Sequence, residues 1–117
     1  MTREFPLTIN DEDVTAKLED SYRAHFKEDE HNYTAQIGKL GGSEDFSILG
    51  TAVGKPCCFF MYGGTDPAKW DEAEKKGTLN EDIPINHSGL FAPVIMPTLK
   101  VGLDAYAIGA LTWLEKK

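Results

Sequence analysis

Histidine and cysteine are the side chains of this sequence with the clearest capacity for chemistry. The chain has three histidines and two cysteines among 117 residues. Cys57 and Cys58 are adjacent, so on a strand they point to opposite faces and cannot share one metal ion or readily form a disulfide. We interpret them as reduced thiols in an apolar strand rather than as a redox or metal site.

The three histidines differ in their surroundings. His25 falls beside the apolar stripe of a predicted helix, and His31 lies in a charged run with nothing to fix its geometry. We expect a structural or solvated role for both. His87 stands between Asn86 and Ser88 in a polar turn flanked by apolar segments, where metal ligands and catalytic bases are often carried. An ordinary exposed turn is the competing interpretation.

Glycine-rich turns are the second kind of candidate. Residues 41–43 precede a predicted helix, and backbone amides at a helix start can accept an anion such as a carboxylate. An ordinary helix start, with Glu44 and Asp45 near its positive end, is the alternative. The turn lacks the spacing of both phosphate-binding glycine motifs. Gly63 and Gly64 follow an apolar run, where they either leave space for a ligand or turn the chain.

The elements that would position these residues follow from periodicity. Residues 5–9 alternate and predict an extended arm, which Pro6 confines to an edge. Asn10 or Asp11 caps a helix that reaches residue 27. Its apolar stripe consists of Val14, Leu18, Tyr22 and Phe26. A short helix is expected from residue 43.

The second half of the chain contains the apolar run and the final helix. The unbroken apolar run at 57–62 predicts a strand covered on both faces. An exposed helical insertion at 65–77 follows, and residues 78–85 are expected to be irregular. The final helix starts after Pro97. Its large apolar side chains fall on one face (Leu99, Leu103, Tyr106, Ala110, Leu114), and its small residues fall on a neighbouring stripe (Gly102, Ala105, Gly109).

Alternating helices and extended segments predict an α/β fold, a partial three-layer sheet with about three helices. The sheet is incomplete, because only residues 57–62 form a convincing strand, while residues 5–9 and 33–37 are doubtful. A strand that is apolar on both faces requires neighbours, so the chain is expected to be a piece of a larger domain. Open sheet edges recruit other strands, which predicts a homo-oligomer formed through a sheet edge or an exposed apolar face. The alternative is a compact monomer in which residues 33–37 and 78–85 fold over the open edges.

Composition restricts the compartment and the partners. Twelve Lys and Arg stand against 19 Asp and Glu, giving a net charge of −7. Cationic side chains supply most non-specific affinity for nucleic acid and for anionic lipid, so we expect neither partner. No apolar stretch is long enough to span a bilayer, and the N-terminus has no apolar signal core. These features predict a cytoplasmic protein.

Several features occur in the order found in one enzyme family. Residues 42–46 read Gly-Ser-Glu-Asp-Phe, residues 57–64 form an apolar run ending in Gly-Gly, and the Asn-His-Ser turn at 86–88 is followed by Phe91. A small-residue-rich apolar helix then ends the chain. In this order the chain resembles the end of a metallopeptidase and amidohydrolase family that includes aminoacylases, hippurate hydrolases, indole-acetyl-amino-acid hydrolases and glutamate carboxypeptidases. Residues 5–11 also resemble the family's return from its lid domain into its catalytic domain.

The resemblance implies a hydrolase of amide bonds in N-acyl amino acids or small peptides. The intact enzyme would hold two divalent metals, zinc or manganese, with a bridging water. His87 would correspond to the terminal metal ligand, and Gly42 and Ser43 to the turn near the substrate carboxylate. Glu44 and Asp45 match the motif, but no role is assigned to them.

The resemblance also implies a domain division and a missing partner. Residues 1–10 would be the return from a missing lid domain, and residues 11–117 the C-terminal part of the zinc-peptidase-like catalytic domain. The remaining metal ligands and the general base would lie in an N-terminal half. This sequence has no His-x-Asp or paired-Glu segment to replace them. No catalytic residue is therefore assigned here, and we expect the fragment alone to be inactive and to bind metal only weakly.

The sequence departs from the family at one motif and leaves two other interpretations open. Gly89 follows Ser88 where many relatives have proline, and residues 92–97 contain no acid, so the substrate subfamily is undetermined. One alternative is a stand-alone binding or assembly module that kept the surface without the chemistry. Another is an unrelated small α/β domain.

Overall fold

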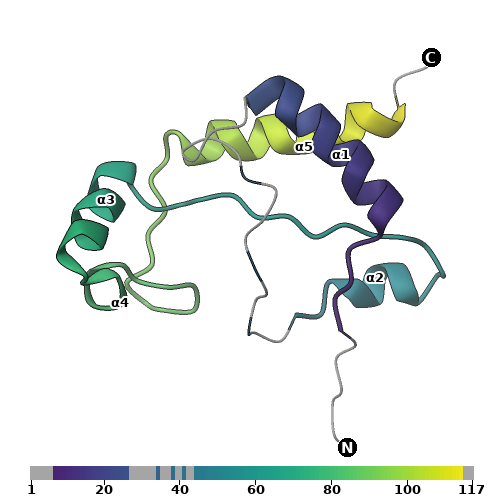
Figure 1. Cartoon of the computed structure of the whole chain (residues 1–117). Helices are drawn as coiled ribbons and strands as arrows, with labels where there is room; N and C mark the ends of the chain where they lie inside the picture. Colours follow the sequence, from purple (N-terminus) through teal and green to yellow (C-terminus); the bar gives the residue numbers. More distant parts are fainter. Residues whose placement is uncertain (1–6, 27–33, 35–37, 39–40, 42–43, 115–117) are drawn as a thin grey trace, which may run out of the picture. The chain divides into compact units, whose positions relative to one another are not determined.

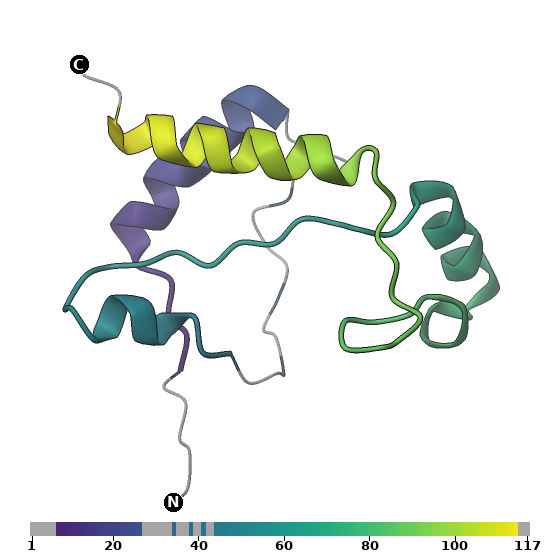
Figure 2. The same cartoon turned by 180° about the vertical axis from the view of Figure 1, so that it is seen from behind.

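The computed structural model describes residues 7–26, 34, 38, 41 and 44–114, and these residues contain five α-helices (Figure 1, Figure 2). The helices are α1 (Glu12–Phe26), α2 (Ser47–Thr51), α3 (Pro67–Lys76), α4 (Leu79–Asp82) and α5 (Thr98–Leu114). The chain divides into a first unit, Met1–Phe60 with Ala105–Lys117, and a second unit, Met61–Asp104. α5 therefore begins in the second unit and ends in the first.

The predicted α/β fold with a partial three-layer sheet is wrong for the described part of the chain, which contains helices and no β-strand. Residues 57–62 run between helices without forming a strand, because their backbone bonds go to two loop residues, Asn10 and Asp11, instead of a neighbouring strand. A strand needs such a neighbour to form its ladder. The doubtful strand at 33–37 lies outside the described residues, except for Thr34.

α1 confirms the predicted amphipathic helix and its cap. The Asp11 carboxylate accepts a hydrogen bond from the Val14 backbone N–H at 3.0 Å, which satisfies one of the unpaired donors at a helix start. Acidic residues occupy the first turn, where the helix dipole favours negative charge. Leu18 and Tyr22 are buried, so the stripe at steps of four faces the core.

The core of the first unit lies between α1 and the end of α5, which cross in both views (Figure 1, Figure 2). Leu18, Tyr22 and Ala105 form its buried centre. The Tyr22 hydroxyl donates a hydrogen bond to the Ala105 carbonyl oxygen at 3.0 Å. A Cβ added at Gly109 would lie 3.7 Å from the Tyr22 hydroxyl oxygen. At Gly109 the atoms nearest to such a Cβ belong to side chains of α1, so the structure does not show the close backbone approach that the small-residue stripe predicted.

A neighbouring side of α5 is largely exposed. We call Leu99, Leu103, Tyr106, Ala110 and Leu114 the outer face of α5. Its four larger side chains expose between 59% and 76% of their area. The periodicity correctly placed these residues on one face, but it did not indicate that this face meets solvent.

In the second unit, α3 begins and ends where the sequence predicts. The Asp66 carboxylate accepts from the Lys69 backbone N–H at 3.0 Å, Pro67 starts the helix, and Gly77 ends it with a φ of 72°. Residues 78–85, expected to be irregular, instead include α4. Thr78 accounts for part of this difference, because its hydroxyl donates to the Asp82 carboxylate at 2.6 Å across the turn.

None of the helices in the described ranges has both the length and the hydropathy needed to cross a bilayer.

Candidate functional site

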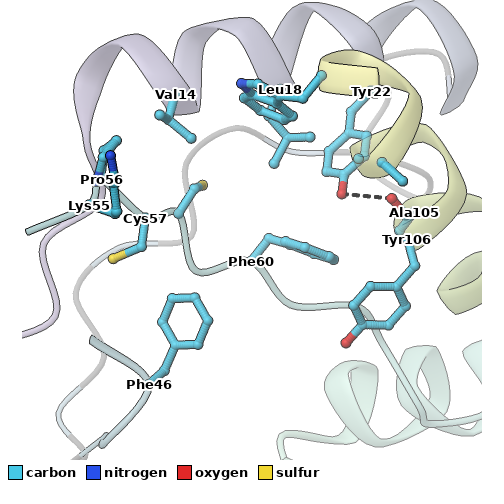
Figure 3. A pocket seen from close by; sticks show the side chains of 14 residues that line it. Val14, Leu18, Tyr22, Phe46, Lys55, Pro56, Cys57, Phe60, Ala105 and Tyr106 are labelled. Carbon is cyan, nitrogen blue, oxygen red and sulfur yellow. Dashed lines mark hydrogen bonds between the residues drawn. The ribbon is translucent and has the colours of Figure 1, made fainter. Parts of the chain in front are cut away.

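The first unit contains an apolar cavity of about 520 Å³, which we call the groove (Figure 3). This volume lies within the range of small-molecule pockets, about 300–1,000 Å³. Its walls come from α1, residues 55–60 and the end of α5, with Phe46 before α2. The lining residues are Val14, Leu18, Tyr22, Phe46, Lys55, Pro56, Cys57, Cys58, Phe60, Ala105, Tyr106, Gly109, Ala110 and Trp113.

Residues 57–60 are extended, and their side chains alternate between two layers of helix. Cys58 and Phe60 pack against the core between α1 and α5. Phe59 makes a ring contact with Phe46 at 5.4 Å between centroids, and a Cβ built at Gly50 of α2 would lie 3.3 Å from the Cys57 sulfur. Figure 3 shows Val14, Leu18 and Tyr22 on one side of this segment and Phe46 on the other. The segment therefore has the side-chain pattern of a strand with helices on both faces.

One edge of this segment is satisfied by the turn before α1. Asn10 brackets Phe59, because its side-chain oxygen accepts from the Phe59 N–H at 2.7 Å and its amide donates to the Phe59 carbonyl at 3.0 Å. The Asp11 N–H donates to the Cys57 carbonyl at 2.9 Å. A single asparagine side chain thus takes the place of a neighbouring strand.

The opposite edge, which we call the open edge, consists of the backbone N–H and C=O groups of Cys58 and Phe60. Backbone groups of alternate residues in an extended segment point to opposite edges. Those of residues 57 and 59 point to Asn10 and Asp11, so those of 58 and 60 point away from them. Across the described ranges, no backbone group bonds the N–H or C=O of Cys58 or Phe60.

Few polar groups face the groove. Among the residues that the structure describes, Lys55 is the only charged one that lines it. The Tyr22 hydroxyl is already engaged by Ala105, and the Cys58 sulfur accepts from the Thr15 hydroxyl at 3.5 Å. Both cysteines are free and half-buried, in agreement with reduced thiols in an apolar segment. The groove offers apolar contact and an unpaired backbone edge, and it has no arrangement of a nucleophile with a base.

His87 lies in the second unit, in the turn that the sequence predicts. The Ser88 N–H donates to the Ile85 carbonyl at 3.1 Å, and the Ser88 hydroxyl accepts from the Leu90 N–H at 3.2 Å. His87 itself is exposed and has a φ of 69°, a left-handed conformation. Within the described ranges it is the only residue other than glycine with a positive φ.

The other residues of the predicted carboxylate-binding turn either lie outside the described residues or form hydrogen bonds with nearby backbone groups. Gly42 and Ser43 lie outside the described residues. The short helix begins at Ser47, not at residue 43 as expected, because Glu44 satisfies the backbone first: its carboxylate accepts from the N–H groups of Asp45 and Phe46 at 3.0 and 3.1 Å. That contact gives Glu44 a structural role that the motif alone did not assign.

The Gly63–Gly64 turn serves chain packing. The Gly64 carbonyl accepts from the Val94 N–H at 2.9 Å, and a Cβ at Gly64 would lie 3.2 Å from the Cβ of Pro93. The Thr98 hydroxyl donates to the Gly63 carbonyl at 3.4 Å. Gly64 therefore permits the close approach of Pro93, a packing role that neither sequence interpretation, space for a ligand or a turn of the chain, described.

A two-metal centre does not fit the residues that the structure describes. Within these ranges no three His, Cys, Asp or Glu side chains gather in a way that could hold a metal ion. His87 alone supplies one imidazole, whereas a catalytic zinc takes about three protein ligands. No catalytic step through a metal is therefore derived for this chain.

No family model matches the chain, and no solved structure matches it. The resemblance therefore depends on the quoted motifs and their order. The groove was not predicted from the sequence, whereas a backbone edge without a sheet neighbour was expected at residues 57–62. The signal that could have found the groove is the asparagine before α1 together with the alternation at 57–60.

Proposed function

We propose that this chain is the C-terminal part of the catalytic domain of a metal-dependent amidohydrolase or peptidase, inactive until the rest of that domain joins it. The intact enzyme would hydrolyse amide bonds of N-acyl amino acids or small peptides and would hold two zinc or manganese ions. His87 would provide one metal ligand, and the turn containing Gly42 and Ser43 would lie near the substrate carboxylate.

The observation that carries this proposal is the backbone of His87. A non-glycine residue with positive φ is uncommon, and such conformations cluster at functional sites. The sequence motif and the backbone conformation select the same residue by independent criteria. The turn leaves His87 exposed, and the two Ser88 hydrogen bonds hold the backbone around it.

The open edge supports the same proposal. A segment covered by helices on both faces, with one backbone edge unpaired within the described ranges, is what a domain with a missing sheet neighbour would show. The same observation also favours the second candidate, a binding or assembly module without catalysis. The two candidates differ in whether His87 is needed for what the assembled protein does.

The first test is a zinc titration of the chain alone, followed by NMR. We expect weak binding that shifts the imidazole signals of His87 before those of His25, which faces Phe26 at 4.8 Å. His87→Ala should abolish the shifts, and His25→Ala should leave them. Tight stoichiometric zinc binding, or shifts that survive His87→Ala, would contradict the assignment of His87 as one isolated ligand.

The second test adds the missing half. The N-terminal part of an aminoacylase, carrying the remaining ligands and the general base, is mixed with the chain and with zinc or manganese. We expect hydrolysis of an N-acyl amino acid only in the mixture, and none with His87→Ala. Hydrolysis by the chain alone, no hydrolysis by the mixture, or equal hydrolysis with His87→Ala would each count against the enzymatic proposal.

A further inference from the structure

The open edge of Cys58 and Phe60 is the most incomplete part of the described structure. A buried, unpaired peptide group costs free energy comparable to a lost hydrogen bond. Cys58 and Phe60 are both half-buried and pack on the core of the first unit. Their N–H and C=O groups, two of each, therefore lie at an apolar groove where a partner would be favourable.

The surroundings of the edge define what can occupy it. An added strand would continue the layer of residues 57–60, so it would meet α2 and Phe46 on one face and α1 with α5 on the other. It must therefore be extended and apolar on both faces. Lys55 is the only charge that the described part of the chain contributes to the groove lining, so these residues offer little to a charged peptide.

Residues 57–60 of the chain itself meet this description. They read Cys-Cys-Phe-Phe, they are extended, and each copy presents them at its own open edge. Two identical edges related by a two-fold axis perpendicular to the strands run antiparallel and form a self-complementary interface. No second sequence is needed to satisfy either copy.

We propose that a second copy of this chain pairs along the open edge, with residues 57–60 of the two copies antiparallel. Cys58 of each copy faces Phe60 of the other, and these pairs exchange the N–H and C=O groups that are unpaired in one copy. The two Phe59 residues then face each other across the axis. This inference does not depend on the proposed enzymatic function.

The dimer must bury more than the groove alone. A stable interface buries about 600–1,000 Å² per partner. Tyr106 and Trp113 line the groove and expose 64% and 46% of their area. The second copy must therefore cover these two aromatic side chains as well as the open edge.

The adjacent cysteines provide a matched pair of variants. Proline has no N–H, so Cys58→Pro removes a donor from the open edge. Cys57→Pro removes an N–H that points to the other edge. The hydrogen bond from Asp11 to residue 57 uses the carbonyl of residue 57, which proline keeps. Both variants lose one thiol and gain one proline. They differ mainly in the edge that they alter.

The experiment is light scattering over a micromolar concentration series, with circular dichroism to confirm helix content. We expect the native chain and Cys57→Pro to give twice the chain mass of 12.9 kDa, and Cys58→Pro to dissociate at least tenfold more readily. A strictly monomeric native chain would overturn the proposal. Equal masses for the two variants, whether both monomeric or both dimeric, would also overturn it.

A crosslink tests the register and stays informative if a proline variant unfolds. Both native cysteines are first changed to serine. In that background Phe59→Cys places one thiol in each copy, and the two thiols face each other across the two-fold axis. Non-hydrogen-bonded antiparallel pairs have Cα atoms about 4.5 Å apart, within reach of a disulfide. We expect mild oxidation to give a covalent dimer with Phe59→Cys and far less with the control Met61→Cys. Equal crosslinking of the two would refute this pairing.

Discussion

α1 and α5 pack together by their inner faces, but their outer faces are built in opposite ways. The exposed side of α1 carries Glu12, Asp13, Lys17 and Asp20. The outer face of α5 carries leucines, an alanine and a tyrosine over sixteen residues, about 22 Å of helix. The charged residues of α5, Lys100 and Asp104, pair with each other four positions apart.

This difference distinguishes a helix surface that is suited to solvent from one that is suited to a contact. Charged side chains on α1 are well solvated, so the helix needs only its inner contacts. A contiguous apolar stripe on a monomeric protein commonly marks an interaction surface. We therefore expect the outer face of α5 to be covered in the assembled protein, which agrees with the proposal that the chain is one part of a larger domain.

The largest expected difference in stability is between two leucine-to-alanine variants. One lies on the buried face of α1 and the other on the outer face of α5. Leu18→Ala removes a side chain that is 6% exposed, and it should lower the free energy of unfolding by about 2–5 kcal/mol. Leu114→Ala removes one that is 76% exposed and should change it by less than about 0.5 kcal/mol. Urea unfolding at one fixed protein concentration measures both. Similar losses would mean that the outer face of α5 is already packed.

An intermediate effect tests the hydrogen bond that joins the two helices. Tyr22→Phe keeps the ring and its edge-to-face contact with Phe60, 5.5 Å between centroids, but removes the donor to the Ala105 carbonyl. That carbonyl belongs to a residue 4% exposed, so water replaces the donor poorly. We expect a loss of about 1 kcal/mol in the same unfolding measurement. An unchanged stability would show that α1 and α5 are joined by apolar packing alone.

The sequence correctly predicted the helices whose ends are set by neighbouring residues. α1 and α3 begin where an aspartate caps them, and α3 ends at a glycine with positive φ, because these signals act within a few residues. The sheet was wrongly predicted, since an apolar run specifies burial but not the neighbour that pairs with it. In the structure that neighbour is the side chain of Asn10, 49 positions from Phe59.

The candidate site was predictable only in part, for the same reason. The turn around His87 follows from a short polar sequence. Its left-handed backbone was not predicted, although histidine is among the non-glycine residues enriched in that conformation. The groove joins Val14, Lys55 and Trp113, and residues so far apart in the chain come together only through tertiary packing.

The smallest expected effects come from two glycines of α5 that differ in the space around them. A Cβ at Gly109 would lie 3.7 Å from the Tyr22 hydroxyl and 3.8 Å from Leu18, which are ordinary contacts. Alanine is favoured over glycine in a helix by about 1 kcal/mol, so Gly109→Ala should raise stability by roughly 0.5–1 kcal/mol. At Gly102 the same Cβ would lie 3.1–3.2 Å from the ring of Tyr62.

Gly102→Ala therefore has to displace that ring, and the displacement offsets the gain in helix propensity. We expect a change between zero and a loss of about 1 kcal/mol. Thermal unfolding of both variants at one concentration gives the comparison directly, since each adds a single methyl group to the same helix. A gain at Gly102 as large as that at Gly109 would show that the Tyr62 ring moves freely and that the contact does not fix the start of α5.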